Sequence, residues 1–237
     1  MSKLNLAMWS GPRNLSTALM YSFANRPDFQ AIDEPFYACY LTKTGLDHPM
    51  GDAVIASQPT DANQVIDGLL AQRDTHYYQK HMTQHMLPDI PRAWIENVTN
   101  VFLIRHPNRV LASFSAKYDN PTPDDIGFRQ QFELYENLVQ RGLSPIVIDS
   151  ADIRRDPTTY LTKLCTALGI DFMPEMLEWP KGPKPFDGVW APHWYGAVHT
   201  STGFAQAEGE IPTLASDLQP IAQTCMGYYT KMMDVKL

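Results

Sequence analysis

The stretch "MWSGPRNLSTALMYSF", residues 8–23, places a tight polar turn between an apolar run and a helical pattern. A strand that ends near Gly11 and continues into a helix near Leu15 leaves several backbone N–H groups free at a helix N-terminus. These N–H groups, together with the helix dipole, favour an anion. The turn therefore predicts a phosphate or sulfate site at the end of the first strand.

The side chains of the turn fit the same interpretation. Arg13 supplies a positive charge at the rim, while Ser16 and Thr17 add hydroxyl donors in the first helical turn. The alternative is an ordinary strand, turn and helix with a solvated arginine and a Ser/Thr cap. The nucleotide-binding pattern GxxxxGK[ST] fits only in part, because Gly11 is followed by Ser16-Thr17 without the second glycine or the lysine. A kinase or NTPase is therefore disfavoured.

Composition narrows the class of protein. The 237 residues are 44% hydrophobic, which is enough for a domain with a buried core. The net charge of -7 predicts no general affinity for nucleic acid or a membrane surface, so an anion must be bound by a local cluster. Cys39, Cys165 and Cys225 lack the spacing of a disulfide framework or a zinc site. Without a signal peptide or a long apolar run, we expect one cytoplasmic domain over residues 1–237.

Apolar runs of strand length alternate with helical patterns, which predicts a three-layer α/β/α fold with a central, mainly parallel sheet. The expected strands cover residues 4–9, 30–34, 76–80, 101–105 and 145–149. The expected helices cover residues 15–25, 107–118, 124–140, 157–168 and 213–233. Two segments rich in Pro, Gly and Asp are expected to be long loops of the kind that form lids, namely residues 43–62 and 180–203.

The opening turn resembles the 5′-phosphosulfate loop of sulfotransferases that use PAPS (3′-phosphoadenosine 5′-phosphosulfate). The usual bacterial form reads roughly G-x-P-R-S-G-T-T-L, and a branch with G-P-R-N-x-S-T is closer to this chain. Asn14 and Leu15 stand where Ser-Gly is common, and leucine tolerates fewer backbone angles than glycine. The resemblance implies that the turn binds the donor through Gly11, Pro12, Arg13, Asn14, Leu15, Ser16 and Thr17.

A second segment, "VFLIRHPNRVLASFSAKY" (residues 101–118), is similar to the R-x-P-x-x-x-x-x-S segment that grips the 3′-phosphate in sulfotransferases. Arg105 ends the expected strand, and Ser113 follows eight residues later on the helix. A guanidinium and a hydroxyl so placed can converge on one phosphate. Arg109 either adds charge there or is solvated.

A third stretch, residues 150–170, resembles the family's E-D-L-x-x-D-P-x-x-x-L-x-x-L-C-x-F-L-G-I run. Its own pattern predicts structure, because Asp156 can cap a helix that begins at Pro157. Cys165 is expected in the core. The segment "KGPKPFDGVWAPHWYGAVHTSTGF" (residues 181–204) either covers the nucleotide or packs on the core. Its relevant side chains are Lys181, Lys184, Trp190, Trp194 and Tyr195.

Sulfuryl transfer requires a base for the acceptor and positive charge for the leaving phosphate, and Arg13 with the loop N–H groups is expected to supply the latter. Glu34 is the first candidate base, because it follows the second expected strand and so lies at the sheet edge that carries the turn. The resemblance supports it, since several sulfotransferase types use a glutamate shortly after the first helix. Asp33 is an alternative, or holds a loop.

A rival base lies in residues 77–87. Cytosolic small-molecule sulfotransferases carry Lys-Thr-His in this region, whereas this chain has Lys80 followed directly by His81, with His85 four residues later. The two histidines also have the spacing of a zinc-binding helix, but Met82 replaces the glutamate of HExxH. Histidines partly buried beside an acceptor pocket remain an equal alternative.

The resemblance thus implies a P-loop-like sulfotransferase fold and transfer of a sulfuryl group from PAPS to a hydroxyl or amine of a small-molecule acceptor, without a metal. Two other classes stay open. One is a small-molecule kinase that uses ATP and magnesium, and the other is a non-catalytic nucleotide-binding protein of the same fold. The acceptor and the oligomeric state are not specified by these motifs.

Overall fold

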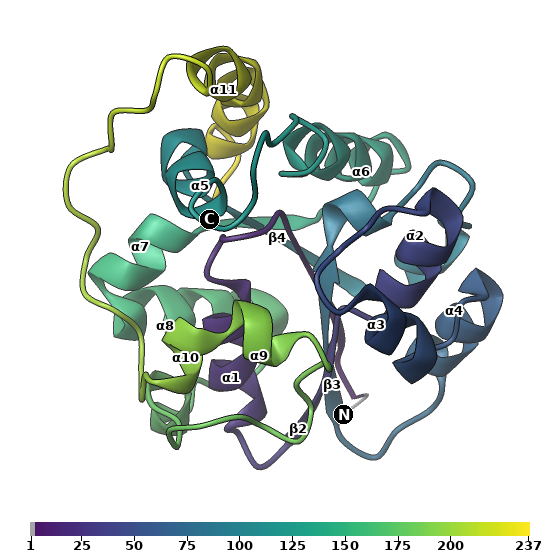
Figure 1. Cartoon of the computed structure of the whole chain (residues 1–237). Coiled ribbons are helices and arrows are strands. Elements are labelled where there is room, and N and C mark those ends of the chain that lie inside the picture. Colours follow the sequence, from purple (N-terminus) through teal and green to yellow (C-terminus); the bar gives the residue numbers. More distant parts are fainter. Residues whose placement is uncertain (1–2) are drawn as a thin grey trace.

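A parallel sheet organises the computed structural model, which describes residues 3–237 (Figure 1). In this part of the chain five strands pair in the order β2-β3-β1-β4-β5, and each pairing is parallel. The strands are β1 (Asn5–Ser10), β2 (Phe29–Asp33), β3 (His76–Met82), β4 (Thr99–Ile104) and β5 (Ile146–Asp149). The expected α/β fold with a parallel sheet is confirmed, and each strand lies within two residues of its predicted bounds.

Strand β1 explains why both faces of the sheet are covered. Successive side chains of a strand point to opposite faces. Leu6 and Met8 accordingly belong to one buried cluster with α1 (Ser16–Ala24) and α8 (Pro157–Leu168). Ala7 and Trp9 belong to another with α4 (Ala62–Leu70) and α6 (Phe128–Gln140). All four side chains are 0% exposed, so the strand reads as an unbroken apolar run rather than an alternating one.

Helices and short 3-10 turns fill the connections. The helices are α1 (Ser16–Ala24), α2 (Tyr37–Thr44), α3 (Gly51–Ser57), α4 (Ala62–Leu70), α5 (Pro107–Phe114), α6 (Phe128–Gln140), α7 (Ser150–Arg155), α8 (Pro157–Leu168), α9 (Ala191–Trp194), α10 (Gly196–His199) and α11 (Gln219–Met233). The 3-10 turns are η1 (Thr83–His85), η2 (Ala93–Asn97) and η3 (Pro174–Leu177). No helix within residues 3–237 is both long and apolar enough to cross a membrane.

Several helix predictions need correction. The loop expected over residues 43–62 contains α3 and reaches the start of α4, and the loop over residues 180–203 contains the short helices α9 and α10. Helix α4 forms because Asp61 caps it by accepting a hydrogen bond from the N–H of Gln64 at 2.9 Å, while Val65 and Leu69 bury one face. Helices α2 and α7 were not predicted. The predicted cap at Asp156 is confirmed, since its carboxylate accepts from the N–H of Thr159, and Cys165 is buried as expected.

An irregular segment, residues 204–214, links α10 to α11 and is called the strap here. In Figure 1 it runs as an extended yellow-green trace along the outside of the molecule, past α8 and α7. Within the described chain, its backbone makes no hydrogen bond to another backbone group. Side chains hold it instead, because Arg154 donates to the carbonyl of Gln206 at 2.9 Å and Asn108 donates to that of Pro212 at 3.1 Å.

Strand order brings the two expected anion-binding turns together. Strands β1 and β4 are neighbours, and Ser10 pairs with Leu103 in their register. Both strands run parallel, so the turns that follow them lie side by side at the carboxyl edge of the sheet. This is where open α/β sheets bind ligands.

Candidate active site

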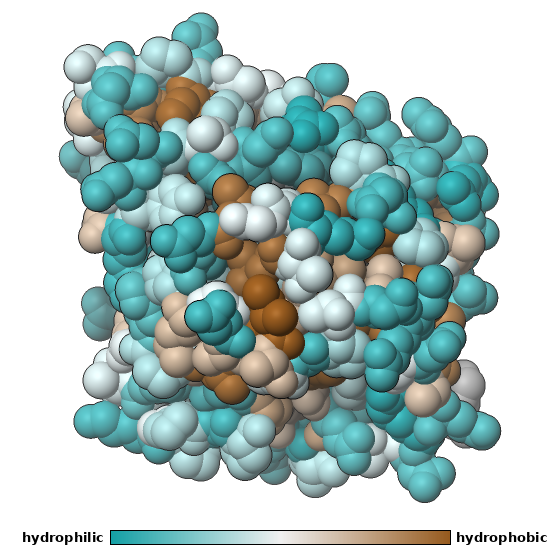
Figure 2. All heavy atoms as spheres, turned by 45° about the vertical axis from the view of Figure 1, so that its right-hand side comes forward, coloured by the Kyte–Doolittle hydropathy of each residue, from teal (hydrophilic) through white to brown (hydrophobic). Residues whose placement is uncertain are grey.

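A cavity of ≈ 320 Å³ opens at this edge of the sheet. Figure 2 shows apolar side chains, in brown, gathered along a recess in the middle of that face and framed by hydrophilic ones. Most of the residues expected from the sequence line the cavity, namely Pro12, Arg13, Asn14, Leu15, Ser16, Thr17, Glu34, Lys80, His85, Arg105 and Ser113. Gly11 and His81 are not among its lining residues.

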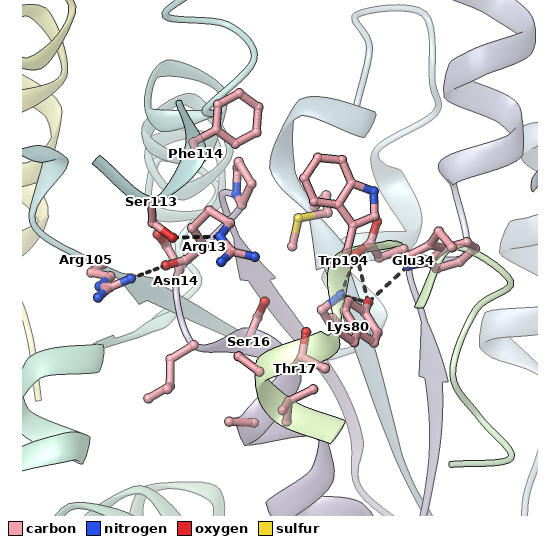
Figure 3. A pocket seen from close by; sticks show the side chains of 18 of the residues that line it. Arg13, Asn14, Ser16, Thr17, Glu34, Lys80, Arg105, Ser113, Phe114 and Trp194 are labelled. Carbon is pink, nitrogen blue, oxygen red and sulfur yellow. Dashed lines mark hydrogen bonds and ion pairs between the residues drawn. The ribbon is translucent and has the colours of Figure 1, made fainter. Parts of the chain in front are cut away.

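The two anion-binding motifs touch each other in the structure. Arg13 donates from Nε to the hydroxyl of Ser113 at 2.8 Å, and Arg105 donates from Nη1 to the carbonyl of Arg13 at 2.6 Å (Figure 3). Partial burial, and then the nearby charge of Arg105, lower the pKa of the Arg13 guanidinium. Two cations held this close favour an anion between or beside them.

The backbone of the opening turn is shaped for this role. Arg13 and Leu15 have φ of 62° and 72°, in the left-handed region that non-glycine residues seldom adopt. A Cβ on Gly11 would lie 2.4 Å from the carbonyl oxygen of Ile126, so only glycine fits that approach. Asn14 is 1% exposed and donates to the carbonyl of Leu103 at 3.2 Å, which ties the turn to the end of β4.

A buried ionic cluster forms the opposite side of the cavity. Lys80 donates from Nζ to Glu34 at 2.5 Å and to Asp33 at 2.8 Å, and its third contact is the hydroxyl of Tyr195 at 2.8 Å. Tyr195 in turn donates to Asp33 at 2.7 Å, and Trp190 donates to the Tyr195 oxygen at 3.0 Å. Figure 3 shows Glu34 and Lys80 facing each other across from the Arg13 side.

Burial and pairing act in opposite directions on this cluster. Burial raises the pKa of the Glu34 carboxyl above its usual range, and the opposing attraction of Lys80 does not cancel that rise. Burial alone would lower the pKa of Lys80, but the charges of Asp33 and Glu34 outweigh it and the pKa is raised. Lys80 therefore stays protonated, while Glu34 has an enhanced affinity for a proton.

The two histidines have different surroundings. His81 is 2% exposed, stacks on Trp9 with ring centroids 4.3 Å apart, and has Nε2 3.0 Å from Oε1 of Gln79. Burial lowers its pKa to about 3. His81 thus lies in the core, away from the cavity. It follows Lys80 directly in β3, and successive side chains of a strand point to opposite faces of the sheet. The paired zinc-helix interpretation does not fit this arrangement, since the chain is a strand at His81.

His85 lies at the cavity wall. Its ring stacks against those of Tyr37 and Tyr40, with centroids 4.6 Å and 4.8 Å apart. Burial lowers its pKa well below the usual range, so the imidazole is neutral near neutral pH. Among the described residues, its Nδ1 has no hydrogen-bond partner.

Aromatic side chains complete the wall beside Glu34. The sequence motifs did not single out Tyr37, Tyr40, His48 and Tyr118, all of which line the cavity. The run "FYACY" at residues 36–40 was the available signal, because large aromatics directly after a strand end lie close to the ligand edge. Of the five side chains singled out in segment 181–204, Trp190, Trp194 and Tyr195 line the cavity. Lys181 and Lys184 are not among its lining residues.

This chain belongs to the sulfotransferase domain family, whose profile matches residues 4–235. Two proteins of Arabidopsis thaliana are similar in sequence. The one named branched-chain-amino-acid aminotransferase-like protein 1 is 41% identical over 83% of this chain and 36% of its own length. Protein 2 of that name is 35% identical over 93% of this chain and 40% of its own length. The chain therefore spans less than half the length of these relatives.

Solved structures share the fold. The sulfotransferase domain from the curacin biosynthetic pathway has a TM-score of 0.58 at 18% identity, covering 95% of this chain and 98% of that one. The sulfotransferase from Alicyclobacillus acidocaldarius has a TM-score of 0.52 at 13% identity, covering 78% of this chain and 88% of that one. At this level of identity the likeness concerns the architecture.

Proposed function

We propose that this protein transfers a sulfuryl group from PAPS to a hydroxyl, or an amine, of a small-molecule acceptor. The observation that carries the proposal is the meeting of two motifs in one cavity, with Arg13 bonded to Ser113 and Arg105 bonded to the Arg13 carbonyl, opposite the buried Glu34. Membership of the sulfotransferase family supports the same reaction.

The donor fits the residues of the first wall. The turn from Gly11 to Thr17 offers N–H groups at the start of α1 for the 5′-phosphosulfate, and Arg105 with Ser113 would hold the 3′-phosphate. The donor supplies an activated sulfuryl group whose S–O bond to the 5′-phosphate breaks as the acceptor oxygen binds sulfur. Arg13 stabilises the charge that collects on the departing phosphate.

Glu34 is the base in this proposal. It accepts the proton of the acceptor hydroxyl as the new S–O bond forms, and its raised pKa makes it a better proton acceptor than an exposed glutamate. Lys80 remains protonated, so it holds Glu34 in position and adds positive charge to the cavity rather than removing a proton.

The acceptor pocket is the aromatic wall beside Glu34. Tyr37, Tyr40, Tyr118 and Trp194 give it a largely apolar surface, as small-molecule sites commonly have. Among the described residues, Lys80 is the only cation that lines this side of the cavity, and it is paired with two carboxylates. Asp125 lines the same wall, so an acceptor without negative charge and with a flat apolar body fits it best.

Binding of adenosine 3′,5′-bisphosphate, the donor product, tests the proposal. We expect the bisphosphate without metal to raise the midpoint of thermal unfolding, because a ligand at 100 times its Kd stabilises by about 2.7 kcal/mol, roughly 5–10 °C here. Arg105→Ala should abolish most of the shift. ATP serves as the comparison, with and without magnesium. A shift only with ATP and magnesium would contradict the proposal and favour a kinase.

A further inference from the structure

A carboxylate occupies the arginine side of the cavity edge. Arg105 donates to Oε1 of Glu208 from Nε at 2.9 Å and from Nη2 at 2.5 Å. Arg154 donates to the same oxygen at 2.8 Å, and Nε of Arg109 lies 2.9 Å from Oε2. One carboxylate thus accepts hydrogen bonds from Arg105 and Arg154 and forms an ion pair with Arg109.

Glu208 differs sharply from the segment that carries it. Its side chain is 3% exposed, whereas its neighbours in the strap, Ala207, Gly209 and Glu210, are exposed. The strap has no backbone ladder, so lifting it away from the molecule breaks only side-chain contacts. The buried carboxylate is therefore the charged attachment of the strap, which is also held by the donors Arg154 and Asn108 and by the buried side chain of Leu214.

The charges at this point do not balance. Arg105, Arg109 and Arg154 contribute three positive charges, and Glu208 contributes one negative charge. A phosphate monoester carries close to two negative charges near neutral pH and three acceptor oxygens. Such a group matches the three guanidinium groups better than a carboxylate does, and Arg105 is already the residue assigned to the 3′-phosphate.

We propose that Glu208 is an internal substitute for the 3′-phosphate of the donor, and that Arg109 and Arg154 are further ligands of that phosphate. The strap must release Glu208 before the three arginines can bind the 3′-phosphate. Glu208 thereby competes with every ligand that carries this phosphate, and with no ligand that lacks it. This inference rests on the donor proposed above.

Competition reduces the apparent affinity by the fraction of molecules in which the arginines are free. Removing the charge of Glu208 increases that fraction. Glu208→Gln should therefore bind adenosine 3′,5′-bisphosphate at least tenfold more tightly than the wild type in calorimetric titration. Its affinity for adenosine 5′-phosphate, which lacks the 3′-phosphate, should be unchanged.

Two further variants separate competition from a structural role. Glu210→Gln removes the same charge from the same strap at an exposed position, so it controls for net charge and should leave both affinities unchanged. Arg154→Ala should weaken binding of the bisphosphate at least tenfold while leaving adenosine 5′-phosphate unaffected. This variant keeps the test decisive even when Glu208→Gln does not fold.

The outcomes are distinguishable. If Glu208→Gln binds both nucleotides equally more weakly, or Arg154→Ala leaves the bisphosphate affinity intact, Glu208 is a structural anchor and the inference is wrong. If neither the wild type nor any variant binds the bisphosphate, the donor assignment itself fails and the inference fails with it. Tighter binding by Glu208→Gln of the bisphosphate alone supports both.

Discussion

Asp33 and Glu34 are adjacent carboxylates that share one lysine, yet their surroundings separate their roles. Asp33 is fully engaged, since it accepts from Lys80, from Tyr195 and from the N–H of Gly188 at 3.1 Å. Glu34 has φ of 42°, which turns its side chain to the cavity, and its main contact is Lys80. Glu34 lines the cavity and Asp33 does not, so we propose that Asp33 positions the cluster and that Glu34 is the carboxylate that meets a substrate.

Glu34→Gln should lower turnover by about 10² to 10⁴-fold, the usual contribution of a positioned general base, with donor binding retained. In the wild type, activity should fall as the pH drops, because the base must be deprotonated, and the midpoint should lie above 4.5 because burial raises the pKa of Glu34. Turnover of an acceptor found by screening phenols, followed across pH, measures both. Full activity of the variant would exclude Glu34 as the base.

At the scale of elements, the opening turn is held between two neighbouring segments. The segment before α6 lies against it, because the carbonyl oxygen of Ile126 is close to Gly11. Gly127, with φ of 70°, then caps the start of the helix. The turn is thus held between the end of β4, through Asn14, and the entry to α6. Its shape depends on both neighbours as much as on its own residues.

Gly11→Ala tests this clamp. The added methyl group would lie 2.4 Å from the Ile126 oxygen, so the backbone must shift, and overpacking of this kind costs about 1–3 kcal/mol. We expect a lower unfolding midpoint and weaker binding of adenosine 3′,5′-bisphosphate. Gly68→Ala is the matched control, because Gly68 is an exposed position of α4 with open space around it. There alanine should increase the free energy of unfolding by about 0.5–1 kcal/mol. Equal effects of the two changes would rule out the clamp.

The strands were predictable from sequence because buried parallel strands read as short apolar runs, as in "VFLI" of β4. Helices α2 and α3 were not, since their residues carry weak or irregular periodicity and α3 buries only Val54. Arg13, Arg105 and Ser113 could be found because each lies at a fixed offset from a strand end. Glu208 could not, since an irregular strap gives no period and its partners are set by tertiary packing.

At the scale of the whole molecule, buried neutral histidines tie stability to pH. The pKa of His81 is lowered to about 3 and that of His85 is also lowered, so between these values and 6.5 the unfolded chain binds more protons than the folded one. Their stabilising contribution is complete above pH 6.5 and is lost as the pH falls. Glu34 and Asp149, whose pKa values are raised, act in the opposite direction, but the pKa values of His48, His76 and His106 are lowered as well.

We therefore expect the free energy of unfolding, measured with urea, to decrease from pH 6.5 to pH 4. His81→Phe keeps an aromatic ring against Trp9 and removes one titrating group, so the slope should become shallower by up to about 1.4 kcal/mol per pH unit. A slope identical to that of the wild type would mean that His81 is protonated in the folded state.

Leu15 has φ of 72° and ψ of 3°, a left-handed backbone conformation that glycine adopts freely and that its surroundings impose on leucine. Its side chain packs at the edge of the cluster around α1, which offsets the strain of that conformation. A search pattern that insists on glycine at this position would pass over this chain, although Leu15 adopts the left-handed conformation that favours glycine.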